Sequence, residues 1–321
     1  MPLDLTIIIP CHNDAPHLER LLPRIAALGL ARQLIVVDDG SDQPLVARDL
    51  QQASGLAAEQ ITLLRQNPPH GAGVARNIAL PHVTSPHLLF LDADDLPTRE
   101  LRDLCAALPH ATPFDFCLFQ HHDSRMERDH LWGQMPFDQA FWTQANLGTG
   151  GLQPVTSKAA QQLVQTANYP WNKIYRSDFL RDNDIRCSDT LVHNDIALHW
   201  QSFLQADRIL ASDHIGVVHF VAANGQRLTN RLGRERLRIF EPLEQVARDI
   251  AQSTAAYQLA FFSFAPRVLL WAHGTLQPEL QPELRHKAQD FLRRHLAPQL
   301  RHELQQQRPP GWAEAQALFD F

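Results

Sequence analysis

The sequence predicts an α/β fold with a mostly parallel sheet, helices on the faces of the sheet and a helical region at the C-terminal end. Short apolar runs alternate with helical stretches over roughly the first 120 residues, and the pattern is helical from about residue 230 onward. A strand, helix, strand order places parallel strands in one sheet. With 321 residues, 44% of them hydrophobic, the chain can bury one large core or two modest ones.

The first half supplies the strands. Five apolar runs rich in Ile, Val, Leu and Phe are bounded by turn residues: Leu5–Pro10, Leu34–Val37, Ile61–Arg65, Leu88–Leu91 and Phe114–Phe119. Between the first two runs, one helical face carries Leu18, Leu21, Leu22, Ile25 and Leu28. We expect Asp14 to cap this helix, Pro16 to lie in its first turn, and Pro23 to kink it or break it in two.

The second half is less regular. Gly148–Gly151 reads as a loop that joins the two halves, and a block from Trp171 to about Leu232 mixes short helices with the apolar run Ile215–Val221. The most apolar window, Ala255–His273, is interrupted by polar residues and by Pro266. We therefore expect a mostly buried helix pair there and not a membrane span.

Composition excludes some classes of protein. Twenty-nine basic residues against 35 acidic ones give a net charge of −6, which argues against general nucleic-acid binding. The four cysteines have no metal-type spacing, so we expect reduced core residues. No leader opens the chain, which favours a cytoplasmic protein. Only three residues are lysine, namely Lys158, Lys173 and Lys287.

Acidic clusters follow two of the strands. Asp38 and Asp39 come after Leu34–Val37, and Asp92, Asp94 and Asp95 come after Leu88–Leu91. Ligands of an open parallel sheet bind at the carboxyl ends of its strands, so both clusters should face one crevice. Oxygen ligands suit Mg²⁺ or Mn²⁺, which in turn binds nucleotide phosphates. The alternative is that these residues are ordinary turn residues.

Four successive motifs strengthen the functional interpretation: Ile7–Asn13 (IIIPCHN), Ile35–Ser41 (IVVDDGS), Gly71–Asn77 (GAGVARN) and Phe90–Asp95 (FLDADD). In order and spacing they resemble the motifs of the family 2 glycosyltransferases, inverting enzymes with the GT-A fold, a Rossmann-like sheet flanked by helices. The resemblance continues in Pro170–Arg176 (PWNKIYR) and Asn194–Asp195, and covers about residues 3–220.

This resemblance implies roles on the donor side. Asp38 or Asp39 would bind the nucleobase, and Pro10, Asn13 and Arg76 would help to form the nucleotide pocket. Arg76 has a plainer alternative, a solvent-facing helix arginine.

The same resemblance implies a metal site. Asp92 would approach the ribose or the metal, Asp94 would be the principal metal ligand, and Asp95 would be secondary, with a possible role as cap of a helix near Pro97. His219 lies near the place where some relatives add a metal-binding histidine, although a structural role is the plainer interpretation.

On the acceptor side, Asp195 is the candidate general base, because the attacking hydroxyl must lose its proton. The alternative is a helix cap. The family normally has Glu before this aspartate, whereas this chain has Asn194. The missing charge should disfavour a raised pKa of Asp195. Trp171 could stack on an acceptor sugar or pack in the core, and Lys173 could lie on the acceptor and phosphate side.

One further cluster contains metal-binding residue types. His121, His122 and Asp123 follow the fifth strand but have no matching partners elsewhere in the sequence. We interpret this cluster as a solvated loop.

The resulting hypothesis is a Mn²⁺- or Mg²⁺-dependent inverting glycosyltransferase of surface polysaccharide biosynthesis. It would use a nucleotide-sugar donor, with a UDP-sugar as first expectation, and a glycan or lipid-linked acceptor. Residues 1–229 would form the catalytic domain, with residues 1–125 as donor half and 126–229 as acceptor half. The helices of residues 230–321 would serve oligomerisation, acceptor binding or docking at the inner face of a membrane. The alternatives are a catalytically impaired GT-A-like scaffold and a nucleotidyltransferase.

Overall fold

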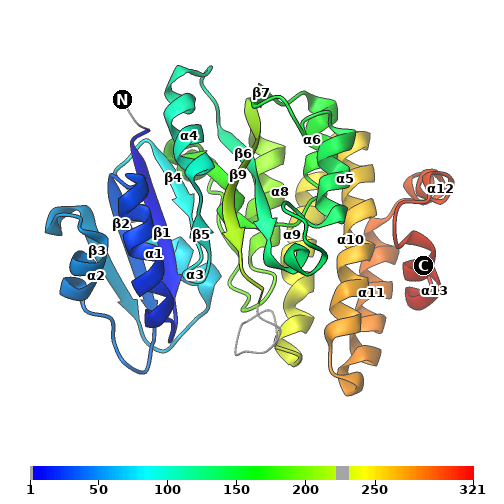
Figure 1. Cartoon of the computed structure of the whole chain (residues 1–321). Coiled ribbons are helices and arrows are strands. Elements are labelled where there is room, and N and C mark those ends of the chain that lie inside the picture. The colour runs from blue at the N-terminus through cyan, green and yellow to red at the C-terminus, as the bar shows by residue number, and fades with distance from the viewer. Residues whose placement is uncertain (1–2, 222–230) are drawn as a thin grey trace.

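A computed structural model describes residues 3–221 and 231–321 of the chain. Its centre is one mixed sheet in the order β3-β2-β1-β4-β8-β6-β9-β5, with β7 paired to β9 (Figure 1). The strands are β1 Leu5–Cys11, β2 Gln33–Asp39, β3 Ile61–Gln66, β4 His87–Phe90, β5 Leu96–Pro97, β6 Phe116–Asp123, β7 Leu152–Pro154, β8 Lys173–Arg176 and β9 Ile209–His219.

Parallel pairing dominates the first part of the sheet. Strands β1, β2, β3 and β4 are mutually parallel where they pair, so their carboxyl ends lie on one edge. Strand β8 runs antiparallel to both β4 and β6, and β6 is again parallel to β9. All five strands expected from the sequence are present, and the central ones are buried because helices cover both faces.

Helices flank the sheet and form the C-terminal part (Figure 1). They are α1 Ala15–Leu28, α2 Ala47–Ser54, α3 Ala72–Ala79, α4 Arg99–Ala107, α5 Pro136–Gln144, α6 Ser157–Leu163, α7 Ser177–Asp182, α8 Asp195–Gln205, α9 Phe240–Ile250, α10 Ala255–Thr275, α11 Gln281–His295, α12 Pro298–Gln307 and α13 Trp312–Phe319.

Helix α1 corrects part of one expectation. It is continuous through Pro23, so the chain does not break into two helices there. Its buried face consists of the five apolar residues that the periodicity predicted. Burial of this face stabilises the helix although Pro23 donates no backbone hydrogen bond. Asp14 is the N-cap residue, but its side chain makes no capping hydrogen bond, and Pro16 lies in the first turn as expected.

Helix α10 corrects another. Residues 255–275 form one helix that contains Pro266, and not the expected pair. It packs against α9, α11, α12 and α13, and Phe261, Ala265 and Leu269 on it are fully buried. No helix in the described part of the chain is long and apolar enough to span a membrane.

Two apolar clusters form the interior. The larger one joins residues of the sheet, such as Ile8, with residues of the C-terminal helices, such as Phe319. The smaller one lies against α1 and α4 on the other face. All four cysteines are unpaired and buried. The predicted domain border at residues 229 and 230 lies outside the described residues.

Candidate active site

Three carboxylates gather where β4 ends. One oxygen of each of Asp92, Asp94 and Asp95 lies within 4.8 Å of those of the other two. Simple alternation along an extended chain would direct Asp95 away from the other two, but the chain turns directly after β4, and the backbone N–H of Asp95 donates to Asp92 O at 3.2 Å. Three oxygen donors at this spacing could hold a hard divalent cation.

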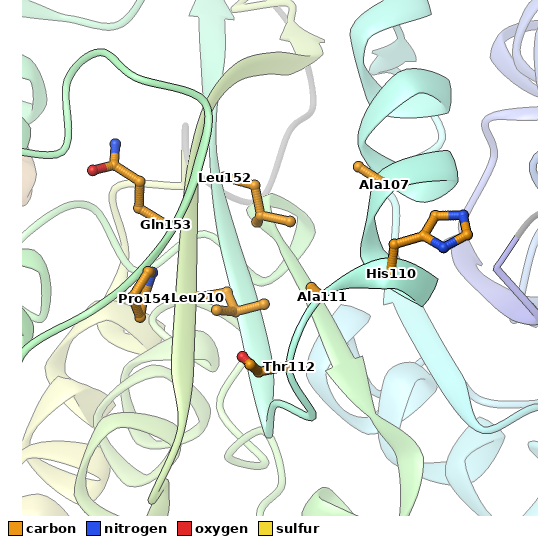
Figure 2. Close-up of a pocket in the computed structure, with 8 residues that line it drawn as sticks. All are labelled: Ala107, His110, Ala111, Thr112, Leu152, Gln153, Pro154 and Leu210. Atoms are coloured by element: carbon orange, nitrogen blue, oxygen red, sulfur yellow. The ribbon is translucent and has the colours of Figure 1, made fainter.

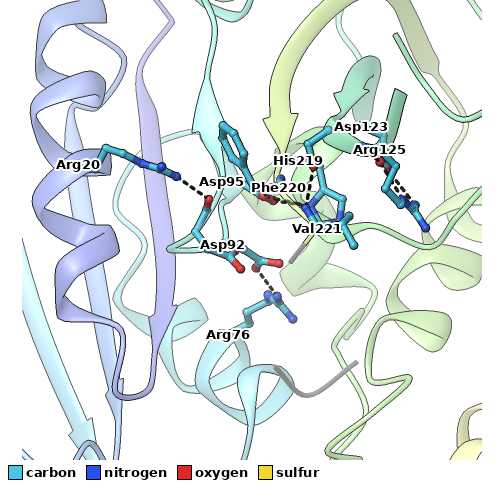
Figure 3. Close-up of polar contacts among 11 residues, drawn as sticks. Arg20, Arg76, Asp92, Asp95, Asp123, Arg125, His219, Phe220 and Val221 are labelled. Carbon is cyan, nitrogen blue, oxygen red and sulfur yellow. Dashed lines mark hydrogen bonds and ion pairs between the residues drawn. The ribbon is translucent and has the colours of Figure 1, made fainter. Parts of the chain in front are cut away.

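His219 joins this cluster from the end of β9. Its Nδ1 lies 3.0 Å and 3.1 Å from the two oxygens of Asp95, and the backbone N–H of Phe220 donates to the same carboxylate (Figure 3). Burial opposes the charge of His219, but the adjacent Asp95 outweighs it and raises the pKa of His219. Asp95 therefore holds His219 and does not cap a helix, since Thr98 caps α4.

Arg76 connects the acidic cluster to the segment that precedes α8. Its Nη2 lies 2.6 Å from Asp92 Oδ1, and its Nη1 lies 3.0 Å from Asn194 Oδ1. The side chain is 5% exposed, which rules out the solvent-facing alternative. Burial opposes the charge of Arg76, but Asp92 raises its pKa further, so it stays protonated. Asn194 lies 118 positions away in the sequence, and no local pattern reveals this contact.

Asp195 begins α8, next to that contact. Burial raises the pKa of Asp195 to about 6, although Arg76 and Lys173 act in the opposite direction. Burial dominates this pKa, because removal of the carboxylate from water disfavours its charged form. The expected effect of Asn194, which adds no negative charge beside Asp195, stays a prediction. A carboxylate with a pKa near neutral suits general-base chemistry.

Asp38 and Asp39 end β2 and are both buried. Asp38 accepts hydrogen bonds from the backbone N–H groups of Ser41 and Leu45 and pairs with Arg65. These bonds outweigh the effect of burial, and they lower the pKa of Asp38.

Asp39 accepts from the backbone N–H groups of His70 and Gly71 and from the side chain of Gln66. Both carboxylates thus fix the loops at the strand ends. Their contact with a nucleobase stays a prediction.

Asn13 lies above the same strand ends, with a left-handed backbone at φ 54°. Its side chain exchanges hydrogen bonds with Asp42, through Nδ2 to Asp42 Oδ2 at 3.1 Å and from the Asp42 backbone N–H at 2.8 Å. It is exposed, whereas Pro10 is buried in β1. Asn13 therefore connects the loops after β1 and β2 and remains accessible from solvent.

Trp171 and Lys173 lie beneath the site. Trp171 is 1% exposed and packs against Tyr169 at 4.4 Å and against His219 at 4.9 Å between ring centroids. Lys173 is fully buried, and its Nζ donates to Tyr169 O at 2.7 Å and to Asn172 Oδ1 at 2.8 Å. Burial lowers the pKa of Lys173 to about 7. In this arrangement both side chains are therefore part of the protein interior next to the site, and Trp171 packs directly against His219.

The cluster of His121, His122 and Asp123 is not a solvated loop. All three residues belong to β6 and are at most 1% exposed. They are buried because β6 continues past Phe119 and stays paired with β9, after two register shifts at Gln120, as far as Asp123 and His219. Asp123 pairs with Arg125, beside His219 (Figure 3).

A pocket of about 270 Å³ lies elsewhere on the sheet. It is lined by the end of α4 and the residues after it, by β7 and by Leu210 near the start of β9 (Figure 2). Leu210 precedes His219 by nine residues, which is about 30 Å along a strand. This pocket is therefore separate from the acidic cluster.

The fold defines the class of the protein. The structure superposes on Staphylococcus aureus TarS 1-349, crystallised with UDP-GlcNAc, with a TM-score of 0.75 and 19% identity, over 99% of this chain and 88% of that one. The same TarS fragment crystallised with UDP matches with a TM-score of 0.74. The shared architecture is the GT-A fold.

The sequence then gives the family. Residues 6–177, more than half of the chain, match the sequence model of Glycosyl transferase family 2. The chain belongs to this family.

Two relatives match over a shorter stretch. Over 96 residues the chain is 35% identical to the pre-mycofactocin glycosyltransferase of Mycobacterium tuberculosis, which is 30% of this chain and 19% of the relative. Over 96 residues it is 34% identical to the succinoglycan biosynthesis protein ExoU of Rhizobium meliloti, which is 29% and 27%. The matched stretch thus spans less than a third of either relative.

Proposed function

We propose that this protein moves a sugar from a nucleotide-sugar donor to a glycan or lipid-linked acceptor, with inversion and with a divalent cation. The observation that carries the proposal is the position of Arg76, which contacts the acidic cluster through Asp92 and the start of α8 through Asn194. The Arg76 guanidinium therefore places the candidate metal site close to the start of the helix that carries the candidate base.

The acidic cluster is the proposed donor end. Asp92, Asp94 and Asp95 would hold Mn²⁺ or Mg²⁺, with His219 fixed beside them by Asp95. Such an ion supplies positive charge next to the diphosphate leaving group. A UDP-sugar is the preferred donor, and the UDP-GlcNAc complex of the structurally similar TarS supports this choice.

Asp195 is the proposed base. It accepts the proton of the acceptor hydroxyl while that oxygen attacks the anomeric carbon from the side opposite the leaving group, which inverts the configuration. The raised pKa of Asp195, about 6, supports this role. The name of the succinoglycan relative supports an acceptor in polysaccharide biosynthesis.

A donor-binding experiment tests the proposal. UDP-, GDP-, dTDP- and CDP-sugars are titrated by calorimetry with Mn²⁺ and with EDTA, and released nucleotide is followed over time. We expect binding and slow hydrolysis of the UDP-sugar that require Mn²⁺ and are lost in Asp94→Ala. Asp103→Ala, a change at an exposed carboxylate of α4, is the matched control.

Three results separate the alternatives. Nucleotide binding without turnover of any donor would favour the impaired scaffold. Transfer of a nucleotidyl group to a sugar phosphate would favour the nucleotidyltransferase. An unchanged Mn²⁺ requirement in Asp94→Ala would contradict the metal site.

A further inference from the structure

The six tryptophans of this chain fall into two groups. Four are at most 4% exposed: Trp142, Trp171, Trp200 and Trp312. Trp132 and Trp271 are 60% and 46% exposed. Exposure of a large apolar indole to water costs free energy, and exposed aromatic surface often marks a binding site. We therefore compared the surroundings of these two side chains.

Each exposed indole packs against a buried histidine. Trp132 stacks on His122, with ring centroids 3.7 Å apart and an angle of 18° between the planes. Trp271 meets His193 edge to face, at 5.4 Å and 89°. The two pairs are thus alike in composition and differ in geometry.

The two histidines differ in their hydrogen bonds. Nε2 of His122 lies 3.1 Å from Glu127 Oε1, and its Nδ1 accepts from the backbone N–H of Gly133 at 3.1 Å. Nε2 of His193 is buried and has no hydrogen-bond partner in the described parts of the chain. A buried polar atom without a partner is uncommon and calls for an explanation.

His193 is held in this position by its surroundings. It is 8% exposed and has a left-handed backbone with φ 64°. Burial lowers the pKa of His193 to about 3, so the ring is neutral at neutral pH. A neutral imidazole can form a hydrogen bond with a hydroxyl group through Nε2.

The pair lies next to the candidate base. His193 precedes Asp195 by two residues, which is at most about 7 Å of chain. Trp271 comes from α10, and the guanidinium of Arg236 lies over its ring at 4.7 Å from the centroid. Arg236 thus covers one part of the indole, while 46% of the Trp271 side chain stays exposed.

We propose that Trp271 and His193 bind a pyranose ring of the acceptor beside Asp195. The C–H face of the ring packs on the indole, and a rotation of the Trp271 side chain uncovers the buried Nε2 of His193 for a hydrogen bond with one ring hydroxyl. This inference rests on the proposed function, because it assigns the acceptor end of the same site to a glycan. It also gives the C-terminal helices a part in acceptor binding, through α10.

The experiment uses two probes with β-linked pyranose rings, cellotriose and chitotriose. Each is titrated by calorimetry into the full chain with saturating UDP and Mn²⁺. We expect Trp271→Ala to raise the Kd of the bound probe roughly tenfold, the order expected for one lost aromatic contact. Trp271→Phe keeps an aromatic ring over Arg236 and should fall between wild type and Trp271→Ala.

Two more variants complete the design. Trp132→Ala is the matched control and should bind as wild type does, because the histidine beside it already has its partners. His193→Asn should weaken binding, and asparagine tolerates the left-handed backbone at this position. Thermal melting of each variant checks that it folds.

The outcomes separate this inference from the proposed function. Binding of neither probe, or equal Kd values for Trp271→Ala and Trp132→Ala, would overturn the sugar site even if the donor titration succeeds. Failure of the donor titration, with probe binding that depends on Trp271, would refute the proposed function and retain the sugar site.

Discussion

The substitution Asn194→Asp tests Asp195 as the catalytic base. The substitution keeps the shape of the side chain. This matters because Asn194 packs tightly on Gly73, where even an added Cβ would lie only 2.6 Å from Asn194 Cβ. It adds one negative charge next to Asp195. A neighbouring negative charge disfavours ionisation, so the pKa of Asp195 should rise from about 6.

The size of the shift follows from the geometry. At an assumed separation of about 6 Å, two negative charges repel by about 3 kcal/mol at an effective dielectric constant of about 20 and by about 0.7 kcal/mol in water. Arg76, whose Nη1 is 3.0 Å from Asn194 Oδ1, offsets part of this repulsion. We therefore expect an upward shift of about 0.5 to 1 pKa unit.

The assay is kcat/KM for the donor between pH 5 and pH 8 at constant Mn²⁺. The reaction needs ionised Asp195, so the rate of the wild type should fall as the pH drops through about 6. The midpoint of this fall should move upward in Asn194→Asp. An unmoved midpoint, or an Asp195→Asn variant that retains wild-type rates, would refute the assignment of the base.

Three further predictions concern the metal and the buried charges. In calorimetry, Asp94→Ala should abolish Mn²⁺-dependent binding of UDP, and retained dependence would move the site elsewhere. Lys173→Arg should unfold at a lower temperature than wild type, with a loss of about 1–3 kcal/mol from overpacking of a fully buried site; an unchanged melting temperature would show that the interior adjusts. His219→Ala should leave the buried Asp95 without its imidazole hydrogen-bond partner and destabilise the metal-free protein by about 1–3 kcal/mol at pH 8. Because burial raises the pKa of Asp95, this carboxyl becomes neutral as the pH falls, and the stability lost in His219→Ala should shrink toward pH 4. Denaturant unfolding of both proteins at pH 8 and pH 4 measures the difference. An equal loss at both pH values would contradict the prediction.

The sequence predicted the first part of the fold well because its signals are local. Apolar runs between turn residues mark β1 to β4, and the apolar spacing of α1 marks the buried helix face. The sequence could not show that the helix continues through Pro23, because the cost of a proline is local, whereas the burial of Leu21, Leu22 and Ile25 that offsets it comes from the rest of the fold.

The site was predictable where strand ends define it. Asp92 and Asp94 come together because they follow one strand directly. The burial of His121, His122 and Asp123 was not predictable from the sequence. It depends on the pairing of β6 with β9, which lies almost a hundred residues later in the chain. Lys173 was expected on the acceptor and phosphate side, but the structure places its ammonium on Tyr169 O and Asn172 in the interior.

The C-terminal helices pack on the rest of the fold. The sequence predicts a separate helical region from residue 230 onward, and that border stays a prediction. In the structure α9 packs on α8, the helix that begins with Asp195, and the larger apolar core continues from the sheet into α10 and α13. Trp271, on that same α10, meets His193 just before α8. Packing that holds these helices on the sheet therefore also fixes the acceptor side of the proposed site.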